Sequence, residues 1–428
     1  MTKIVKPTYL FLLTLLLFAC QGVENETENE QIFTPKDYVP KKYTLNEAHE
    51  IHEKFHEDKK SRNEFSHYLD LHRSEFMPHG MINRTGPVRE LKYNLREDVA
   101  NHRVPFDGQD VALSDYIDYI NSDGFIILHK GEIVFEAYNG MKHYEKHHIY
   151  SCTKFFIGTT ILMLEEEGLI NLENTVAYYL PELAETAWGM VPIKDVLDMS
   201  SGMAGSMEFF WNDKGWPRFD ELQSSPYDRL KDMKANRNPG EVYRYNDVNP
   251  QVLGWIIESV TGYSAFEYVQ NRIWQKMGAE GDAQYLLSSG YNAVYMGTMS
   301  CTLRDLARFG LLFTPSGKDS PYDIISDRII KKIQNEGRSE ILENTGPIGL
   351  PIYDDPTSDD HLILGEAPHH ISNQLDFVMN DGDFMKCGAM GQGLYISPDK
   401  DLVIAFMASE RTPYHAIGRR LAISGLFE

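Results

Sequence analysis

The chain has 428 residues, of which 42% are hydrophobic and 12% aromatic, so it can bury a large core and is not an intrinsically disordered protein. Without residues 1–19, a segment expected to be removed, it carries 39 basic and 63 acidic residues, a net charge of −24. So negative a chain is unsuited to binding nucleic acid or anionic lipid headgroups.

The first nineteen residues predict an export signal. Two lysines precede the apolar run from Tyr9 to Phe18, which has the length of a signal peptide and is short for a membrane span. The run ends in Leu-Phe-Ala-Cys at 17–20, which resembles the lipobox of bacterial lipoproteins, so we expect lipidation of Cys20 and anchoring to a membrane. That resemblance implies a place in the bacterial cell envelope, periplasmic or surface-facing. An ordinary secretory signal with an incidental cysteine is the alternative.

Two segments are expected between this signal and the main domain. Residues 20–42 are acidic, contain two prolines and predict a flexible tether. Residues 43–120 predict a helical prelude, in which charged residues from Leu45 to about Leu71 favour a solvated helical stretch. His49, His52 and His56 have a spacing that could hold a metal on one helix face. Exposed histidines are the more ordinary interpretation, and we predict no metal.

Residues 121–428 show the patterns of a mixed α/β domain. The expected elements are a hairpin over Phe125–Tyr138, a helix over Phe155–Glu167, mostly helical structure over 170–300, a second hairpin over Gly393–Phe406 and a last helix from about Tyr414 to Leu426. Strands near both ends with helices inserted between them predict one sheet accompanied by a helical lobe.

Ser151 and Lys154 form the first candidate for chemistry. Three residues apart at the start of a predicted helix, they share a face, which brings an amine within reach of a hydroxyl. The pattern is weak alone, because Ser151 could be a helix cap and Lys154 a surface residue.

Four segments in order strengthen this candidate. They are His148–Lys154, Met199-Ser200-Ser201-Gly202, the block Pro239–Gly262 with Tyr245-Asn246-Asp247, and Lys386-Cys387-Gly388. Together they resemble the motifs of the serine β-lactamase and penicillin-binding protein superfamily, from about Ser122 to Ser409. Within it the chain is most similar to the class C-like serine hydrolases, and among these to the 6-aminohexanoate-dimer hydrolases. The resemblance implies a β-lactamase/transpeptidase-like α+β fold, in which helices flank an antiparallel sheet beside a mostly helical lobe.

The resemblance also implies roles for individual residues. Ser151 would be the nucleophile, and Lys154 and Tyr245 would share proton transfer, with the identity of the base left open. The backbone N–H groups of Ser151 and Ala389 would form the oxyanion hole. The expected substrate-binding residues are Asp247, Lys386, Cys387 and Gly388, and no cofactor is implied.

Two positions depart from the family pattern. Asp247 stands where asparagine is frequent, and an ionised carboxylate accepts hydrogen bonds but cannot donate one. Cys387 stands where a hydroxyl residue would bind a substrate carboxylate, and a thiol is a poor donor. Both departures weaken the case for β-lactam hydrolysis. A disulfide between Cys152 and Cys387 is conceivable, although buried packing is the preferred interpretation.

These features predict an envelope serine hydrolase that cleaves small amides or esters through an acyl-enzyme on Ser151, of the 6-aminohexanoate-dimer hydrolase or esterase type. The alternatives are a D-amino-acid peptidase, a β-lactamase, and a non-catalytic lipoprotein that binds peptidoglycan. The sequence does not decide the oligomeric state.

Overall fold

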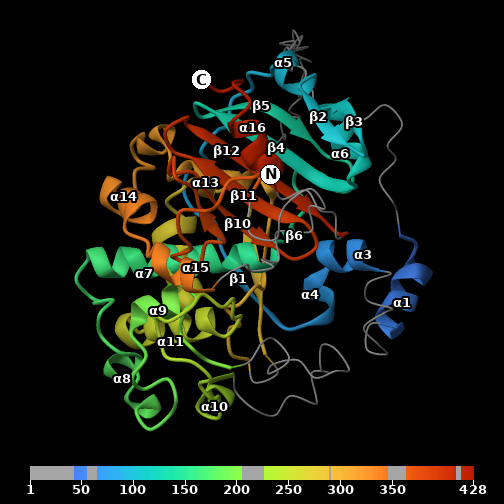
Figure 1. The fold of residues 1–428 in the computed structure, drawn as a ribbon. Helices are drawn as coiled ribbons and strands as arrows, with labels where there is room; N and C mark the ends of the chain where they lie inside the picture. The colour runs from blue at the N-terminus through green and yellow to red at the C-terminus, as the bar shows by residue number, and fades with distance from the viewer. Residues whose placement is uncertain (1–42, 55–64, 205–225, 289–290, 346–362, 411–415) are drawn as a thin grey trace, which may run out of the picture. The chain divides into compact units, whose positions relative to one another are not determined.

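A six-stranded antiparallel sheet is the main sheet of the computed structural model, which describes residues 43–54, 65–204, 226–288, 291–345, 363–410 and 416–428 (Figure 1). Its strands, in spatial order, are β5 (Glu132–Ala137), β4 (Ser122–His129), β12 (Leu402–Ala408), β11 (Gln392–Ser397), β10 (Phe384–Gly388) and β9 (Phe377–Val378). The first and last parts of the domain therefore meet at the β4–β12 pair, in which Ile127 lies opposite Ile404.

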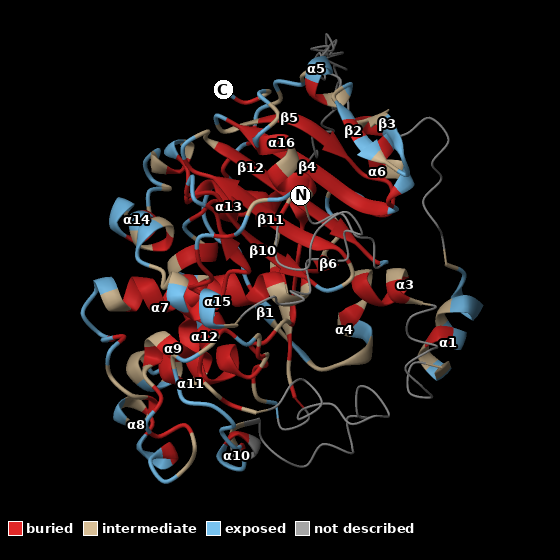
Figure 2. Cartoon of the chain, viewed as in Figure 1, coloured by how far each residue is buried: buried red, intermediate tan, exposed pale blue. Residues whose placement is uncertain are grey.

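Helices cover both faces of this sheet. On one face, Ile126 and Leu128 of β4 pack in an apolar cluster with helices α7 (Thr153–Glu166) and α13 (Leu303–Leu311). The intervening residues Phe125 and Ile127 pack on the other face with α6 (Leu113–Tyr119) and α16 (Ile417–Ala422). Burial on both faces explains why β4 contains the unbroken apolar run Phe125–Leu128 (Figure 2).

The remaining strands form a second sheet of four strands and a separate two-stranded hairpin. The sheet runs β1 (His79–Ile82), β7 (Ala283–Leu286), β8 (Met299–Cys301) and β6 (His147–His148), and the hairpin pairs β2 (Arg103–Phe106) with β3 (Gln109–Ala112). The short strand β6 matters most for function, because the chain leaves it three residues before Ser151.

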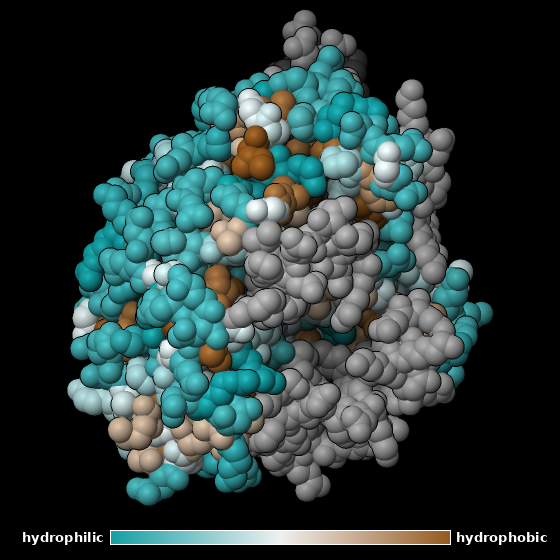
Figure 3. Space-filling model, in the orientation of Figure 1, coloured by the Kyte–Doolittle hydropathy of each residue, from teal (hydrophilic) through white to brown (hydrophobic). Residues whose placement is uncertain are grey.

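The remaining helical elements range from three residues in η1 to thirteen in α11. They are α1 (Leu45–Lys54), α3 (Ser66–Leu71), α4 (Arg73–Phe76), α5 (Glu97–Ala100), the 3₁₀ turn η1 (Tyr150–Cys152), α8 (Val176–Tyr179), η2 (Pro181–Leu183), α9 (Ile193–Leu197), α10 (Pro226–Lys231), α11 (Asn249–Thr261), α12 (Ala265–Val269), the π-turn η4 (Gln270–Trp274), η5 (Pro315–Lys318), α14 (Asp327–Asn335) and α15 (Ser339–Thr345). The surface that the described residues form in Figure 3 is predominantly hydrophilic, in keeping with the acidic composition.

Both predicted hairpins and the helix after the serine are confirmed, as β4–β5, β11–β12 and α7. The last helix is shorter than expected, since it ends at Ala422, and Gly425 has a left-handed backbone with φ of 83°.

The N-terminal prelude differs from the expectation in two ways. It contains the strands β1, β2 and β3, and α3 is largely buried where a solvated helix was expected. No helix among the described residues is long and apolar enough to cross a membrane. The predicted signal, Cys20, the tether and His56 lie outside the described residues.

Candidate active site

Ser151 lies between the end of strand β6 and the start of helix α7. The turn η1 holds Ser151 between β6 and α7, so that Lys154 follows it by one helical turn. Tyr150, directly before the serine, has a left-handed backbone with φ of 45°, a conformation that costs a non-glycine residue energy. Such a sharp turn presents Ser151 at the surface of the site instead of burying it along the helix.

Two side chains meet the hydroxyl of Ser151. Nζ of Lys154 lies 2.9 Å from Oγ, and the hydroxyl of Tyr245 donates to Oγ at 2.8 Å. Lys154 comes from α7, and Tyr245 comes from the loop before α11, ninety-four residues after Ser151. The structure thus brings together the three residues that sequence motifs predicted to act on one proton.

The surroundings of Lys154 favour a neutral amine more than water does. Its side chain is fully buried, and its Nζ also contacts the backbone carbonyl of Met296 and lies 2.8 Å from Oδ1 of Asp247. Burial lowers the pKa of Lys154 below its usual value, and the Asp247 carboxylate offsets part of that shift. We call Lys154 and Asp247 the helix wall of the site.

Tyr245 lies close to two lysine side chains. The Nζ atoms of Lys154 and Lys386 lie 5.2 and 5.0 Å from the centre of its ring. Burial nevertheless raises the pKa of Tyr245 well above its ordinary value, and the carboxylates of Asp247 and Asp376 add to the shift. The phenol is therefore a protonated donor at neutral pH.

The opposite side of the site is built on the β9–β10 hairpin, and we call Asp376, Lys386 and Cys387 the strand wall. Nζ of Lys386 lies 2.6 Å from Oδ1 of Asp376, and the backbone N–H of Cys387 donates to Oδ2 at 2.6 Å. Both charged side chains are almost completely buried. Lys386 was expected to meet substrate, and the structure shows that its charge is already balanced by Asp376.

Sequence reasoning missed Asp376. It stands ten residues before Lys386 in no recognisable motif, and the antiparallel register of β9 and β10, in which Phe377 lies opposite Met385, brings it there. The only available signal was an aspartate at the start of a short apolar run.

Gly388 and Ala389 end the third motif beside the nucleophile segment. A Cβ atom on Gly388 would lie 2.5 Å from the carbonyl oxygen of Ile149, so only glycine allows this approach. Ala389 follows in the exposed turn after β10. The three cysteines of the described residues, Cys152, Cys301 and Cys387, are free and buried, and burial raises the pKa of the Cys387 thiol well above its ordinary value.

The segment Met199–Gly202 supports the loop that carries Tyr245. The carbonyl of Met199 accepts a hydrogen bond from the backbone of Arg244 at 2.7 Å, and Ser201 donates to Asn249 at 2.8 Å. Its motif resemblance therefore corresponds to a bracing contact and not to a contact with Ser151. Among the described residues, no group of histidine, cysteine, aspartate or glutamate side chains could hold a metal ion.

A serine, a buried lysine and a tyrosine on such a sheet-and-helix frame define a serine hydrolase of the β-lactamase fold. The model of the Beta-lactamase family matches residues 118–426, and the chain belongs to that family.

One relative and two structural neighbours refine the comparison. The chain is 26% identical over 351 residues to the 6-aminohexanoate-dimer hydrolase of Paenarthrobacter ureafaciens, covering 79% of this chain and 84% of that protein. It is similar to the structure of a putative 6-aminohexanoate-dimer hydrolase from Bacillus anthracis, with a TM-score of 0.70, 26% identity and coverage of 83% and 91%. A class C β-lactamase from Rhodobacter sphaeroides shares the fold at 16% identity and a TM-score of 0.50, with coverage of 72% and 95%.

Proposed function

We propose that the protein hydrolyses small amides or esters through an acyl-enzyme on Ser151, as a hydrolase of the 6-aminohexanoate-dimer type. The observation that carries the proposal is the pair of contacts on Ser151 Oγ, 2.9 Å from the Lys154 amine and 2.8 Å from the Tyr245 hydroxyl. A structural serine has no need of a buried lysine whose pKa is lowered.

In this proposal the Lys154 amine is the base. Its pKa is lowered whereas that of Tyr245 is raised, so Lys154 is the better proton acceptor and Tyr245 the better donor. Lys154 takes the Oγ proton while Oγ bonds to the substrate carbonyl carbon. Tyr245 then donates its proton to the leaving amine or alcohol, and the Lys154 ammonium gives its proton to the Tyr245 phenolate, so that both groups regain their starting forms.

Deacylation repeats these steps with water. The amine of Lys154 removes a proton from a water molecule that attacks the ester carbon, and Ser151 leaves with a proton from Tyr245 or Lys154. During both halves the negative carbonyl oxygen would be held by the backbone N–H groups of Ser151 and Ala389. Loss of one such donor typically costs about 3 kcal/mol of transition-state stabilisation.

The substrate class is proposed from the relatives and from the two walls. Two similar proteins are called 6-aminohexanoate-dimer hydrolases, one of them putative, and the first aligns over 84% of its length. Asp247 and Cys387 occupy positions where hydrogen-bond donors would suit a β-lactam, so a linear amide is the better candidate. Asp247 and Lys386 would contact the substrate while they remain paired with Lys154 and Asp376.

Covalent labelling tests this function. The full chain is treated with a fluorophosphonate and its intact mass is compared with that of Ser151→Ala. We expect one adduct on the wild type and none on the variant, with turnover of the 6-aminohexanoate dimer or of p-nitrophenyl esters. A folded wild-type chain that takes no adduct would instead support the peptidoglycan-binding alternative, and rapid turnover of a chromogenic cephalosporin would support a β-lactamase.

We also propose that Cys20 is lipidated and that the enzyme works in the bacterial cell envelope, because the apolar run closes on Ala19-Cys20. Expression in a bacterial host should place the wild-type chain in the membrane fraction with an acylated N-terminus. Cys20→Ala should lose the acyl groups. Recovery of unmodified wild-type protein in the soluble fraction would contradict the anchor.

A further inference from the structure

We propose that the N-terminal segment Ser66–Arg73 is a positioning clamp for the nucleophile, and that it acts on Ser151 through the side chain of Tyr150. The inference rests on the proposed function, since it concerns how Ser151 is held for acylation. It assigns Tyr150, Asp70 and Arg73 as positioning residues, none of which contacts Oγ.

The clamp binds the phenol of Tyr150 through two hydrogen bonds. Its hydroxyl donates to Oδ1 of Asp70 at 2.7 Å and accepts from the Arg73 guanidinium at 2.6 Å. Arg73 also pairs with Asp70 at 2.8 Å and lies 5.5 Å from the centre of the Tyr150 ring. One phenol is thus held at its hydroxyl by two charged groups and at its ring face by one of them.

The backbone of Tyr150 explains why such a hold is needed. Its φ of 45° lies in a region that a residue with a side chain leaves unless its surroundings oppose this. A relaxation of Tyr150 would rotate the next peptide, which contains the N–H expected in the oxyanion hole and leads to the Cα atom that bears the Ser151 side chain. Fixing the phenol therefore fixes the direction of the nucleophile.

The charged residues of the clamp are buried, so their contact with Tyr150 is part of the protein interior and not a surface contact. Asp70 is 1% exposed and Arg73 is 7% exposed, although both are charged and lie on short helices. Charged side chains are buried at this level only where they are paired, and here the partner they share is Tyr150.

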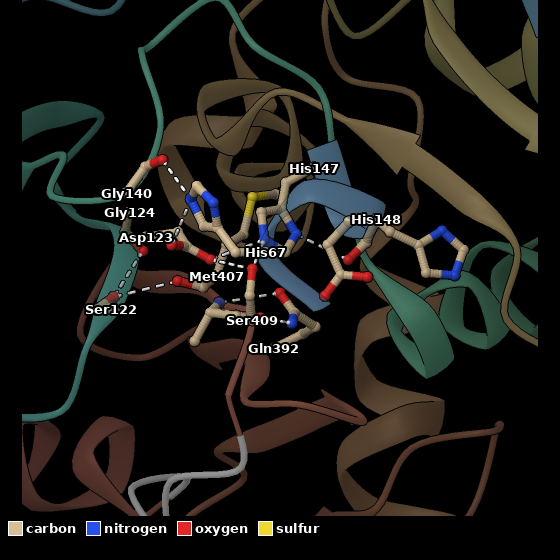
Figure 4. Close-up of polar contacts among 12 residues, drawn as sticks. His67, Ser122, Asp123, Gly124, Gly140, His147, His148, Gln392, Met407 and Ser409 are labelled. Carbon is tan, nitrogen blue, oxygen red and sulfur yellow. Dashed lines mark hydrogen bonds and ion pairs between the residues drawn. The ribbon is translucent and has the colours of Figure 1, made fainter. Parts of the chain in front are cut away.

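A second contact anchors the same segment to the strand that leads to Ser151. His67 contacts the carbonyl of Gly140 at 2.7 Å and Oδ1 of Asp123 at 3.4 Å, and the other oxygen of Asp123 lies 3.0 Å from Nε2 of His147 on β6 (Figure 4). The segment is thus linked to the chain before Ser151 at two places. It is linked through Asp123 to His147, four residues before the serine, and it contacts Tyr150 directly.

The Asp123–His147–Ser409 group is not a second catalytic triad. Asp123 and Ser409 contact the same nitrogen of His147, and the Ser409 hydroxyl donates to Asp123, whereas the other ring nitrogen faces the carbonyl of His148 (Figure 4). Its side chains are buried, and its role is to tie β6 and β4 to the clamp.

The clamp comes from outside the matched part of the chain. The family match begins at residue 118, and Ser66–Arg73 precedes it by more than forty residues. The positioning of Ser151 is therefore supplied by a segment that the family motifs do not include.

Removing the phenol hydroxyl tests the clamp. Tyr150→Phe keeps the ring and deletes the group that Asp70 and Arg73 hold. Tyr68→Phe is the matched control, because it deletes a hydroxyl from α3 that donates to Glu75 at 2.8 Å and touches no part of η1. We expect Tyr150→Phe to lower the rate of fluorophosphonate labelling of Ser151, and kcat on a p-nitrophenyl ester, by about tenfold to a hundredfold with KM unchanged.

The control should keep at least half the wild-type rate. Asp70→Asn combined with Tyr150→Phe should cost no more than Tyr150→Phe alone, which is the mark of a shared contact. If Tyr150→Phe does not fold, Arg73→Lys replaces it, and a loss of labelling rate at unchanged KM supports the clamp in the same way.

Three results would overturn the clamp. Labelling of Tyr150→Phe or of Arg73→Lys at the wild-type rate would show that Ser151 is positioned without it. Equal losses in Tyr150→Phe and Tyr68→Phe would reduce the contact to general stability. A wild-type chain that takes no adduct would remove the proposed function first, which separates that failure from a failure of the clamp alone.

Discussion

The two walls of the active site contain the same pair of residue types and use them differently. The helix wall joins Lys154 to Asp247 at 2.8 Å, and the strand wall joins Lys386 to Asp376 at 2.6 Å. Both lysines are buried, and both lie about equally far from the Tyr245 ring. Only Lys154 contacts Ser151. A buried lysine–aspartate pair therefore does not define a catalytic group, and what distinguishes Lys154 is its place one helical turn from the serine.

The largest expected difference between the walls is in catalysis. Lys154→Ala removes the proposed base and should lower kcat/KM by about a thousandfold, within the range of general acid–base catalysis. Lys386→Ala leaves the Ser151 contacts in place and should lower it by about tenfold, through the loss of positive charge near Tyr245. Steady-state kinetics on a p-nitrophenyl ester, with thermal unfolding as the check on folding, compares the two. Equal losses would mean that Lys154 is not the base.

The second difference concerns stability. Asp376→Asn leaves Lys386 buried without a counter-charge and should lower the free energy of unfolding by about 3 kcal/mol, whereas its amide oxygen can still accept from Cys387. Asp247→Asn should cost about 1 kcal/mol, because the Asp247 side chain is 16% exposed and water can reach the site it leaves. Urea unfolding of both variants measures the difference. A larger cost for Asp247→Asn would mean that the helix wall contributes more to stability than the strand wall does.

The third difference is in pH dependence. In the proposed mechanism activity rises with pH as Lys154 loses its proton. The Asp247 carboxylate raises the pKa of Lys154, so its removal in Asp247→Asn lowers that pKa further and moves the acidic limb of kcat/KM to lower pH. Asp376→Asn should move the limb less, since Asp376 is a smaller contribution to the same shift. A limb that moves to higher pH in Asp247→Asn would contradict Lys154 as the base.

The smallest effects are expected at the cysteines. Cys152→Ser and Cys387→Ser should each change the free energy of unfolding by at most about 1 kcal/mol, because a hydroxyl is a better donor than the thiol in a site of similar size. Cys387→Ser alone should lower KM for a substrate with a free carboxylate by a few-fold. Kinetics on substrates with and without that carboxylate tests the strand wall as a binding surface, and an equal change for both would argue against it.

Local patterns predicted the parts of the fold and site that depend on neighbouring residues. The apolar runs around Lys130-Gly131 gave the expected β4–β5 hairpin, and the spacing of apolar residues after Ser151 gave the expected helix α7. Ser151 and Lys154 needed only the helical repeat to be placed together. Tyr245 was found by resemblance to a family motif, since no spacing rule connects it to the serine.

Asp376 and Asp70, whose partners come from other parts of the chain and which belong to no recognised motif, were not predicted. Asp376 becomes the partner of Lys386 through strand register, and α3 was expected to be solvated because its polar sequence does not show that Asp70 meets Tyr150. An amphipathic pattern indicates only which face of a helix is apolar on average, whereas α3 buries Asp70 against the polar groups of Arg73 and Tyr150.

By itself the sequence determined the order of the motifs, the acidic charge, the hairpins and the serine–lysine pair, because each depends on residue type and on short spacing along the chain. Only the tertiary structure decided which aspartate pairs with which lysine, that Tyr245 is a proton donor beside two lysines, and that a segment before residue 118 contacts the residue next to Ser151. These features depend on burial and on contacts between distant segments, which shift pKa values and fix backbone angles in ways that no local pattern contains.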